Sequence, residues 1–410
     1  MSLFTKKKNV QISSNNKSSS FMLCVLMICV ELGNKHTIMG IKISYLGCLF
    51  FAISLIIDAL KNRLVLFSSN RDICNFQFFL LAWLFYGIIQ TIVNSLFDQI
   101  ALEGLILLIL NILLAFFLLV NSNSRKHITR YINVISIMLI ICIIISFWEI
   151  KTGNHIIEIT YYEKYRNLVF ATFYNQNDYC TFLCLGIILQ ILGVKLANNK
   201  KQKVFYITII ILSGYMAYYT QSRASYICLL IFAVLWFVYS VGEKILFRNA
   251  GLITYVIVSS AVIMVFLCGG VTVLIYLIDP ERLMIYSRHI AVISNNFLFG
   301  YGPMMLAKLT GIAPHNLYIE FIGDFGIVFF ILFFYFTLVK FLRYSTNGRP
   351  SRALLCAFAL MIPILGCSSS NIQRIRIFWM AIALCYSFLF NKTTDDFTHN
   401  VCQKISKNLK

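Results

Sequence analysis

Three groups of polar residues interrupt an otherwise apolar sequence, and their side chains are suited to anion binding and proton transfer. The first group begins at Arg166 and continues through the amides of Asn175, Gln176 and Asn177. Amides near the start of an apolar helix need partners in hydrocarbon, so we expect them to face a bundle interior or a water-filled cavity. The alternative is that they are hydrogen-bond links between helices. Arg166, at the entrance of that helix, is harder to explain as such a link.

The second group is the short turn at residues 219–225, in which Arg223 follows Ser222. Because the turn joins two apolar runs directly, it holds Arg223 at the membrane surface with little freedom to move away. The backbone amides and hydroxyl groups of such a turn favour an anion beside the guanidinium. The alternative is an interfacial Arg that contacts lipid headgroups.

The third group contains Arg288, a glycine-rich turn at Phe299–Pro303, and then His315, Asn316 and Glu320. His315 and Asn316 lie at a predicted helix N-terminus, where free N–H groups and the helix dipole favour an anion. Histidine can also exchange a proton near neutral pH. We interpret His315 as a catalytic or ligand-contacting residue; the alternative is an ordinary interfacial histidine.

The composition defines the setting of these groups. Of the 410 residues, 59% are hydrophobic and 12% are charged, against roughly half and a quarter in soluble domains. The mean hydropathy is +0.79. This excludes a soluble enzyme, a nucleic-acid-binding domain and a secreted disulfide scaffold, and it predicts an all-α polytopic membrane helix bundle. The net charge of +19 is therefore interpreted from its distribution among the loops and not as a sign of nucleic-acid binding.

Twelve apolar runs are expected to span the membrane, with a large outer loop between the ninth and the tenth. The Lys-rich start and the apolar stretch at residues 21–32 resemble a signal peptide, but we expect a first membrane helix because no small-residue cleavage site follows. The spans cover residues 20–34, 38–60, 74–94, 101–120, 131–149, 168–193, 204–221, 224–241, 251–274, 316–339, 353–370 and 375–390.

The distribution of basic residues predicts the orientation. Most of the 35 Lys and Arg residues fall on one side of this topology, which places both termini in the cytoplasm. We expect a disordered cytoplasmic N-terminus at 1–19, a transmembrane catalytic domain at 20–390 and a cytoplasmic tail at 391–410. The two longer outer loops cover about 149–167 and 275–315.

The outer side contains few basic residues, yet it keeps several arginines. A guanidinium offers a planar fork of donors that suits phosphate oxygens, so we expect these residues to bind an anion; the alternative is chance in a small sample. The outer arginines are Arg166, Arg223, Arg282, Arg288, Arg374 and Arg376. No cofactor or metal motif is apparent, and the 13 cysteines lie mostly in apolar runs, where we expect them to pack.

The order of these motifs resembles that of the bacterial O-antigen ligase and O-antigen polymerase superfamily. Phe173-Tyr174-Asn175-Gln176-Asn177 is similar to its Phe-x-Asn-x-Asn segment, and Thr220-Gln221-Ser222-Arg223-Ala224 is similar to its Ser-Arg turn. Arg288, Phe299-Gly300-Tyr301-Gly302 and His315-Asn316 complete the order in a late outer loop. The resemblance covers roughly residues 160–390.

The resemblance implies a metal-independent glycosyltransferase in the bacterial inner membrane that needs no cofactor. Its donor would be a glycan on undecaprenyl diphosphate, and its acceptor a hydroxyl group on the outer face. Arg223 and Arg288 would hold the diphosphate, while His315 would activate or orient the acceptor. The other expected substrate-binding residues are Arg166, Asn175, Asn177, Asn316, Glu320, Arg374 and Arg376.

Polymerase and ligase differ in acceptor, and we favour the polymerase because nothing in the outer loop marks a lipid A-core acceptor. A lipid-linked oligosaccharide flippase is the alternative from another class, although transporters more often show repeat-related halves. The implied partners are undecaprenyl-diphosphate-linked oligosaccharides, the lipid bilayer, a chain-length regulator and a flippase, with no nucleic acid.

Overall fold

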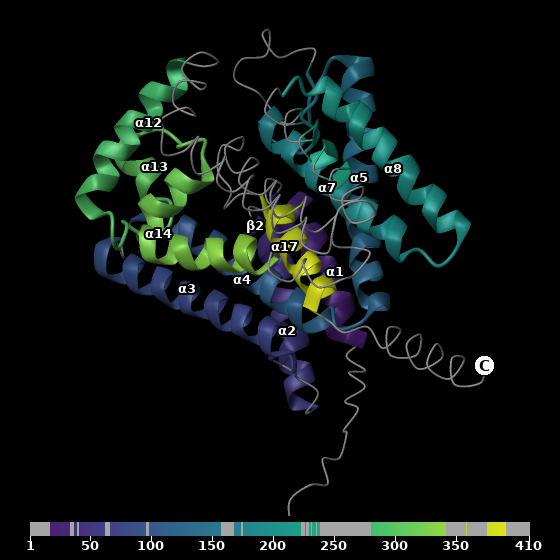
Figure 1. Cartoon of the computed structure of the whole chain (residues 1–410), viewed down its shortest axis with the longest axis horizontal. Helices are drawn as coiled ribbons and strands as arrows, with labels where there is room; N and C mark the ends of the chain where they lie inside the picture. The colour runs from purple at the N-terminus through teal and green to yellow at the C-terminus, as the bar shows by residue number, and fades with distance from the viewer. Residues whose placement is uncertain are drawn as a thin grey trace, which may run out of the picture.

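A computed structural model gives the arrangement of the helices (Figure 1). It describes residues 17–32, 37–38, 41–61, 66–95, 98–156, 168–173, 175–222, 280–341 and 375–390, together with single positions between 226 and 237 and Phe358. The predicted spans 251–274 and 353–370 therefore lie outside the described residues, apart from Phe358. The predicted tails at 1–19 and 391–410 also lie outside them, apart from the helical backbone at 17–19.

In the described part of the chain, the regular secondary structure is helical except for one pair of two-residue strands. The helices are α1 (Lys17–Leu32), α2 (Ile43–Leu60), α3 (Arg71–Ser95), α4 (Gln99–Asn121), α5 (Arg125–Thr152), α7 (Gln176–Leu196), α8 (Lys200–Tyr219), α12 (Pro280–Ile293), α13 (Met305–Thr310), α14 (Leu317–Phe334) and α17 (Arg376–Phe390). A 3-10 turn covers Ser294–Asn296, and a π-helical turn covers Tyr335–Val339. The strands β1 (Thr37–Ile38) and β2 (Ile41–Lys42) pair antiparallel.

Six of these helices are long and apolar enough to cross a membrane. They are α2, α3, α4, α5, α7, and α14 with its π-helical extension. The expectation of a helical membrane protein with several spans is therefore confirmed, whereas the number twelve and the sides of the loops stay predictions. The start predicted for the sixth span at residue 168 is wrong. Residues 168–173 are not helical, and α7 begins only at Gln176.

Polar side chains fix where several helices begin. The helices α4, α5, α7, α8 and α14 each start at a side chain whose oxygen accepts a backbone N–H of the first turn. Such caps satisfy donors that have no partner inside the helix. The capping residues are Asp98, Ser124, Asn175, Asn199 and Asn316. Two predicted site residues, Asn175 and Asn316, thus have a structural role at helix N-termini.

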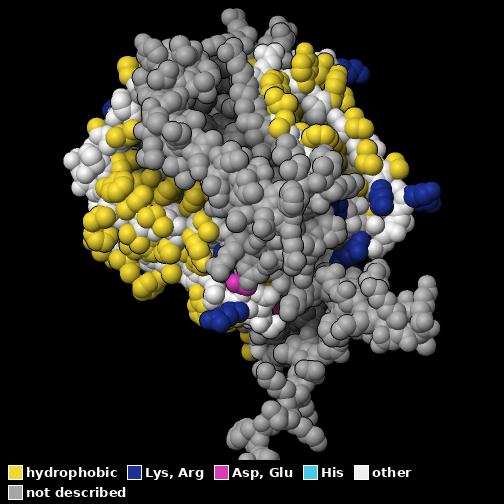
Figure 2. All heavy atoms as spheres, viewed as in Figure 1, with side chains coloured by type: hydrophobic (Ala, Val, Ile, Leu, Met, Phe, Trp, Pro, Cys, Tyr) yellow, Lys and Arg dark blue, Asp and Glu magenta, His cyan; other side chains and the backbone are white. Residues whose placement is uncertain are grey.

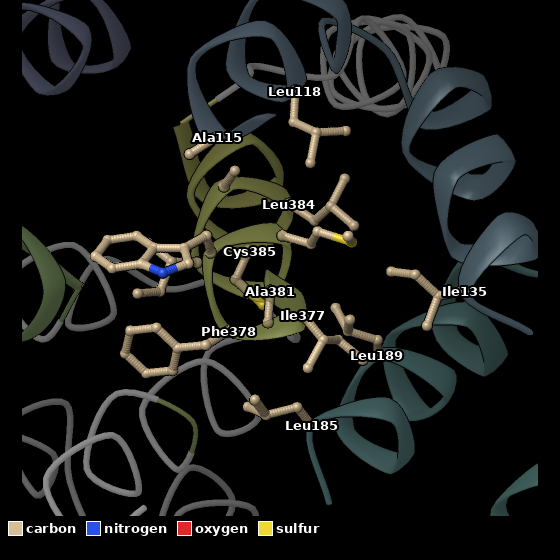
Figure 3. Close-up of a cluster of buried hydrophobic side chains, with 14 of the residues drawn as sticks. Ala115, Leu118, Ile135, Leu185, Leu189, Ile377, Phe378, Ala381, Leu384 and Cys385 are labelled. Atoms are coloured by element: carbon tan, nitrogen blue, oxygen red, sulfur yellow. The ribbon is translucent and has the colours of Figure 1, made fainter. Parts of the chain in front are cut away.

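The core forms around α17, the last described helix. It packs against α1, α3, α4, α5 and α7, and its residues from Arg376 to Ser387 are all buried. A helix with apolar residues on every side requires such an enclosed position. Figure 3 shows part of this cluster, with labelled side chains Ala115, Leu118, Ile135, Leu185, Leu189, Ile377, Phe378, Ala381, Leu384 and Cys385.

Polar contacts join the end of α14 to α3 and α17 at one end of the bundle. Lys340 Nζ lies 2.7 Å from Asp72 Oδ1, and Asn70 Nδ2 donates to the carbonyl oxygen of Phe390 at 2.8 Å. These contacts bring the three helix ends together, and the side of the membrane on which they lie stays a prediction.

α14 is interrupted near its middle at Gly326, where φ is 80° and ψ is 168°. A break of this kind leaves backbone groups without helical partners. Residues 297–302, which we call the clasp, lie against the break. Three hydrogen bonds join them, from Ile327 N to Phe297 O (3.0 Å), from Tyr301 N to Gly323 O (2.9 Å) and from Gly302 N to Asp324 O (2.8 Å). The glycine-rich turn seen in the sequence therefore provides hydrogen-bond partners for the backbone at the break in α14.

We expect Gly326→Ala to destabilise the protein, because an alanine Cβ there would clash with the carbonyl oxygen of Leu298. The backbone conformation at Gly326 is one that only glycine adopts readily and costs other residues about 1 to 3 kcal/mol, and the clash adds to this. The measurement is Tm in detergent. Gly214→Ala in α8 is the control, because nothing lies within 4 Å of an added Cβ there. Equal Tm values for the two variants would contradict the close approach of the clasp.

Candidate functional site

The structure places seven of the ten predicted site residues. They are Asn175, Asn177, Arg288, His315, Asn316, Glu320 and Arg376, whereas Arg166, Arg223 and Arg374 lie outside the described residues. The seven fall into a cluster at the start of α7, a cluster around α12 to α14, and Arg376 in the core.

In the first cluster, the start of α7 meets the end of α8. Asn175 Oδ1 accepts the backbone N–H of Asn177 at 2.8 Å. The hydroxyl group of Ser222 donates to Asn177 Oδ1 at 2.7 Å, and Ser222 is buried. Ser222 directly precedes Arg223 in the chain. The hydrogen bond therefore joins the asparagine motif to the Ser-Arg turn, two segments that the sequence indicated separately.

This cluster also shows how the three amides are placed: Asn175 precedes α7, and Gln176 and Asn177 lie in its first turn. Asn175 caps α7, because its short amide can accept a first-turn N–H while its backbone stays extended. Gln221, beside Ser222, has φ of 52°, a conformation that is uncommon without glycine and often accompanies functional sites. The asparagine motif thus fixes a helix N-terminus beside a tightly bent turn.

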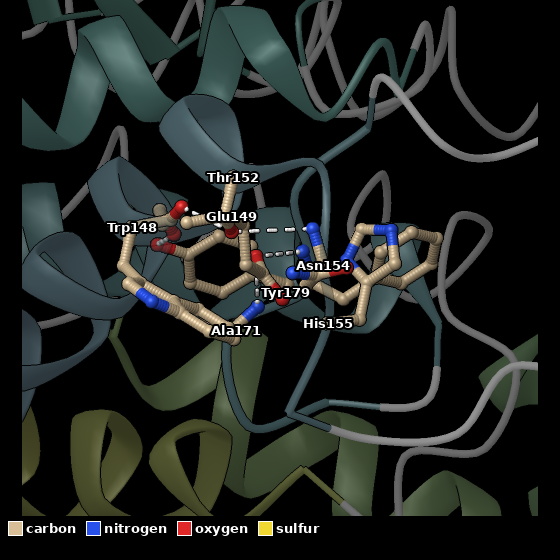
Figure 4. A network of polar contacts seen from close by, with 9 residues as sticks. Trp148, Glu149, Thr152, Asn154, His155, Ala171 and Tyr179 are labelled. Atoms are coloured by element: carbon tan, nitrogen blue, oxygen red, sulfur yellow. Dashed lines mark hydrogen bonds and ion pairs between the residues drawn. The ribbon is translucent and has the colours of Figure 1, made fainter.

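A buried carboxylate, which the site prediction did not include, holds the segment that leads into α7. Glu149 Oε2 accepts the backbone N–H groups of Phe170 and Ala171, both at 2.9 Å, and Glu149 Oε1 lies 3.1 Å from His155 Nδ1 (Figure 4). Ala171 has φ of 49°, so the chain bends directly after these two N–H groups. Glu149 therefore fixes residues 168–173, directly before Asn175.

The sequence did contain a signal for this cluster. Glu149 and His155 lie six residues apart in the predicted outer loop at 149–167. An acid and a histidine at the end of an apolar helix are candidates for an internal polar contact. Their common partner, the backbone at residues 170 and 171, could not be found from local spacing.

In the second cluster, α12 is tied to the segment that precedes His315. Arg288 is exposed on α12, while the next residue, His289, is fully buried. The His289 ring lies with Nδ1 2.6 Å from the carbonyl oxygen of Ile285 and Nε2 3.0 Å from that of Ile312. The helices α12, α13 and α14 pack on one another. We call residues 280–325 the outer module; it contains both Arg288 and His315.

His315 has a strained backbone. Its φ is 50°, and the residue, which follows Pro314 and precedes the cap residue Asn316 in the chain, is half-buried. Asn316 Oδ1 accepts the N–H groups of Tyr318 (2.9 Å) and Ile319 (3.3 Å). A left-handed histidine costs conformational energy, and such residues concentrate at functional sites. The cap therefore holds His315 in a fixed position at the start of α14.

The predicted residue Glu320 is buried one turn into α14, so it faces the protein interior and not the solvent. Asp324, one turn further, was not predicted as a site residue. Its carboxylate accepts the backbone N–H groups of Met304 (2.8 Å) and Leu306 (3.0 Å). Asp324 thus stabilises the start of α13 and the clasp, which is a structural role.

Arg376 is buried at the first residue of α17. A guanidinium inside a bundle is retained only where polar partners compensate for its lost hydration. This position differs from a lipid-facing edge, where an Arg would contact headgroups. Arg376 is therefore placed in the bundle interior.

The two clusters lie in different parts of the bundle. Figure 1 shows α5, α7 and α8 on one side of α17, and α12, α13 and α14 on the other side, above α3. A single pocket that includes both clusters stays a prediction, because the three arginines expected to complete it are outside the described residues.

An ion pair attaches the outer module to the start of α4. Lys308 Nζ contacts Asp98 Oδ2, and Asp98 Oδ1 accepts the N–H groups of Ile100 (3.0 Å) and Ala101 (3.1 Å). The hydrogen bond from Lys308, followed by that from the Ala101 N–H, lowers the pKa of the Asp98 carboxyl. Both side chains are partly exposed, so we treat this pair as an attachment and not as catalytic chemistry.

Comparisons with known proteins give no assignment. No family model matches the chain, and no curated protein matches it. The residues, their geometry and the motif resemblance are therefore the basis for a proposed function.

We expect Glu149→Ala to destabilise the protein by about 1 to 3 kcal/mol, because buried N–H groups lose their acceptor. Glu149→Gln retains one oxygen and should cost less. The measurements are Tm in detergent and hydrogen exchange of the Phe170 and Ala171 amides. Glu103→Ala is the control, since the Glu103–Lys42 pair is largely exposed and such pairs contribute little. Unchanged exchange at residues 170 and 171 would disprove the role of Glu149.

The lowered pKa of Asp98 predicts a pH dependence. The contribution of the charged Asp98 to stability is complete above the ordinary carboxyl pKa and is lost as pH falls through the lowered pKa of the folded state. Asp98→Asn keeps a cap oxygen but removes the charge, so the variant should lack this part of the acid-induced fall in Tm. Identical Tm–pH curves for the two proteins would contradict the prediction.

Proposed function

We propose that this chain is a membrane-embedded glycosyltransferase of the polymerase type. It moves a growing glycan from undecaprenyl diphosphate to a lipid-linked repeat unit on the outer face of the bacterial inner membrane. The observation that supports this most is the hydrogen bond between Ser222 and Asn177. It joins two motifs that lie 45 residues apart and that match the superfamily pattern separately.

The proposed reaction breaks the bond between the anomeric carbon and the diphosphate oxygen. The leaving diphosphate keeps the electron pair, the acceptor hydroxyl oxygen bonds to the anomeric carbon, and the hydroxyl proton passes to His315. Negative charge on the leaving group increases during this step. Fixed guanidinium groups and helix N-termini in a site with little water stabilise that charge more than the ground state.

In this proposal Arg223 and Arg288 bind the diphosphate, and the fixed left-handed backbone at His315 orients the imidazole toward the acceptor. Asn175 and Asn316 use their carboxamide oxygens as caps, so they contribute by fixing helix N-termini near the anion. Asn177 is bonded to Ser222 and thus positions the turn that carries Arg223.

The remaining residues of the proposed site are binding groups. Arg166, Glu320, Arg374 and Arg376 are proposed to contact the glycan or the diphosphate. The burial of Arg376 supports a site that opens toward the bundle interior. The transfer is proposed to be metal-independent, as the resemblance implies.

Glycolipid analysis of a deletion strain tests the proposed function. One repeat unit on the normal final acceptor is the result expected for a polymerase. Long polymer stranded on undecaprenyl diphosphate would instead identify a ligase, and repeat units confined to the cytoplasmic side would identify a transporter. Either of the last two results overturns the polymerase proposal.

We expect Arg223→Ala, Arg288→Ala and His315→Ala each to reduce polymer formation by about a hundredfold or more while the protein stays inserted. Arg223→Lys should also be impaired, since an ammonium lacks the planar fork. Polymer length on gels and protein level on blots are the measurements. Arg71→Ala is the control, because this exposed arginine begins α3 at the end of the bundle away from the outer module. Normal polymer from Arg288→Ala would remove its assignment to the leaving group.

A further inference from the structure

Three consecutive large apolar side chains project from the clasp into the surroundings of the protein. Phe297, Leu298 and Phe299 are 46%, 56% and 63% exposed. The hydropathy pattern placed them in an outer loop at 275–315, outside the membrane. Large apolar side chains gathered on a water-facing surface are unusual in a protein and mark a contact surface.

The backbone of this turn is satisfied by protein groups. The carbonyl oxygen of Phe297 accepts the N–H of Ile327 at 3.0 Å. The carbonyl oxygen of Phe299 accepts hydrogen bonds from the hydroxyl group of Tyr86, at 2.6 Å, and from Gln90 Nε2. An exposed turn in water needs no such partners, because water provides them. Hydrocarbon provides none, so backbone at membrane depth must be satisfied by the protein.

The clasp continues the lipid-facing surface of α3. Tyr86 and Gln90, which bind Phe299, belong to α3, a candidate membrane span. The same half of α3 exposes further apolar side chains, namely Phe85, Ile89, Ile92 and Val93. Figure 2 shows hydrophobic side chains gathered on the side of the molecule where Figure 1 places α3, α13 and α14. The exposed side chains of the clasp therefore extend the apolar surface that α3 requires as a membrane span.

The segment directly before the clasp exposes both polar and apolar side chains. On α12, Ser287 and Arg288 are exposed beside Met284 and Ile290, and Ser294 is exposed in the 3-10 turn that follows. A helix that exposes both kinds of side chain is typical of the membrane interface, with its polar groups in the headgroup region.

We propose that Phe297, Leu298 and Phe299 insert among the lipid acyl chains next to α3 and anchor the outer module in the bilayer. The binding partner is the hydrocarbon of the leaflet at that end of α3. Inserted side chains fix the depth of the module, so Arg288 lies at the level of the lipid phosphates. The consequence for catalysis rests on the proposed function; the lipid contact does not.

Photo-crosslinking of the full-length protein in native membranes tests the proposal. The photoreactive residue p-benzoylphenylalanine replaces Phe299, and parallel variants carry it at Phe85 and at Ser287. Phe85, in the middle of α3, is the lipid-facing reference; Ser287, an exposed polar residue of α12, is the control. Mass spectrometry identifies the adducts, and activity is not required.

We expect lipid adducts at positions 299 and 85 and none at 287. The proposal is overturned if position 299 behaves like 287, or if its adducts are with a second copy of this chain or with another protein. Leu298→Cys gives a second measurement that does not depend on an apolar probe. Vesicles that contain the variant are treated with a membrane-impermeant maleimide on both sides. The cysteine at position 298 should stay unmodified while Ser287→Cys reacts; equal modification of the two would overturn the proposal.

Discussion

Hydrocarbon offers no hydrogen-bond partners, so each polar group in the membrane part of this protein must find one within the chain. The break at Gly326 in α14 would leave backbone groups without partners, and the clasp closes it with three backbone hydrogen bonds. Glu149 does the same for the turn before α7 by accepting two N–H groups. Both sets of hydrogen bonds lie where a helix is interrupted or begins, and both join segments that are separated in the sequence.

The lack of hydrogen-bond partners in hydrocarbon also explains why the candidate site residues make contacts that stabilise the fold. Asn175 and Asn316 cap helices, and Asn177 binds Ser222. A helix N-terminus fixed by a cap presents its remaining N–H groups in a constant direction, which is what an anion-binding site needs. Capping and anion binding are therefore compatible roles for one motif, so the hydrogen-bond alternative for the amides does not exclude the functional one.

Composition and hydropathy were sufficient to predict a helical membrane bundle, and the last span, predicted at 375–390, lies within one residue of α17 (Arg376–Phe390). The start of α7 was misplaced, because hydropathy does not distinguish the apolar turn at 168–173 from a helix. The contacts of Glu149, His289 and Asp324 were not predicted either. Apart from His155 and Ile285, their partners lie 18 to 23 residues away, and local spacing does not reveal such pairs. In the sequence, only the order of the motifs grouped Arg288 with His315. The structure places both residues in one packed module.

The substrate class proposed for this protein has a charged diphosphate attached to an apolar lipid, so both parts must be bound at once. A site in water would expose the lipid, and a site deep in the bundle would require dehydration of the diphosphate. The outer module has the two required surfaces next to each other: polar residues with Arg288 on α12, and apolar residues on the clasp. Because Gly326 allows the clasp to approach α14 closely, the position of the apolar surface relative to His315 is fixed by backbone contacts and not by flexible side chains. The break in α14 is thus the structural reason why the clasp and His315 keep a fixed position relative to each other.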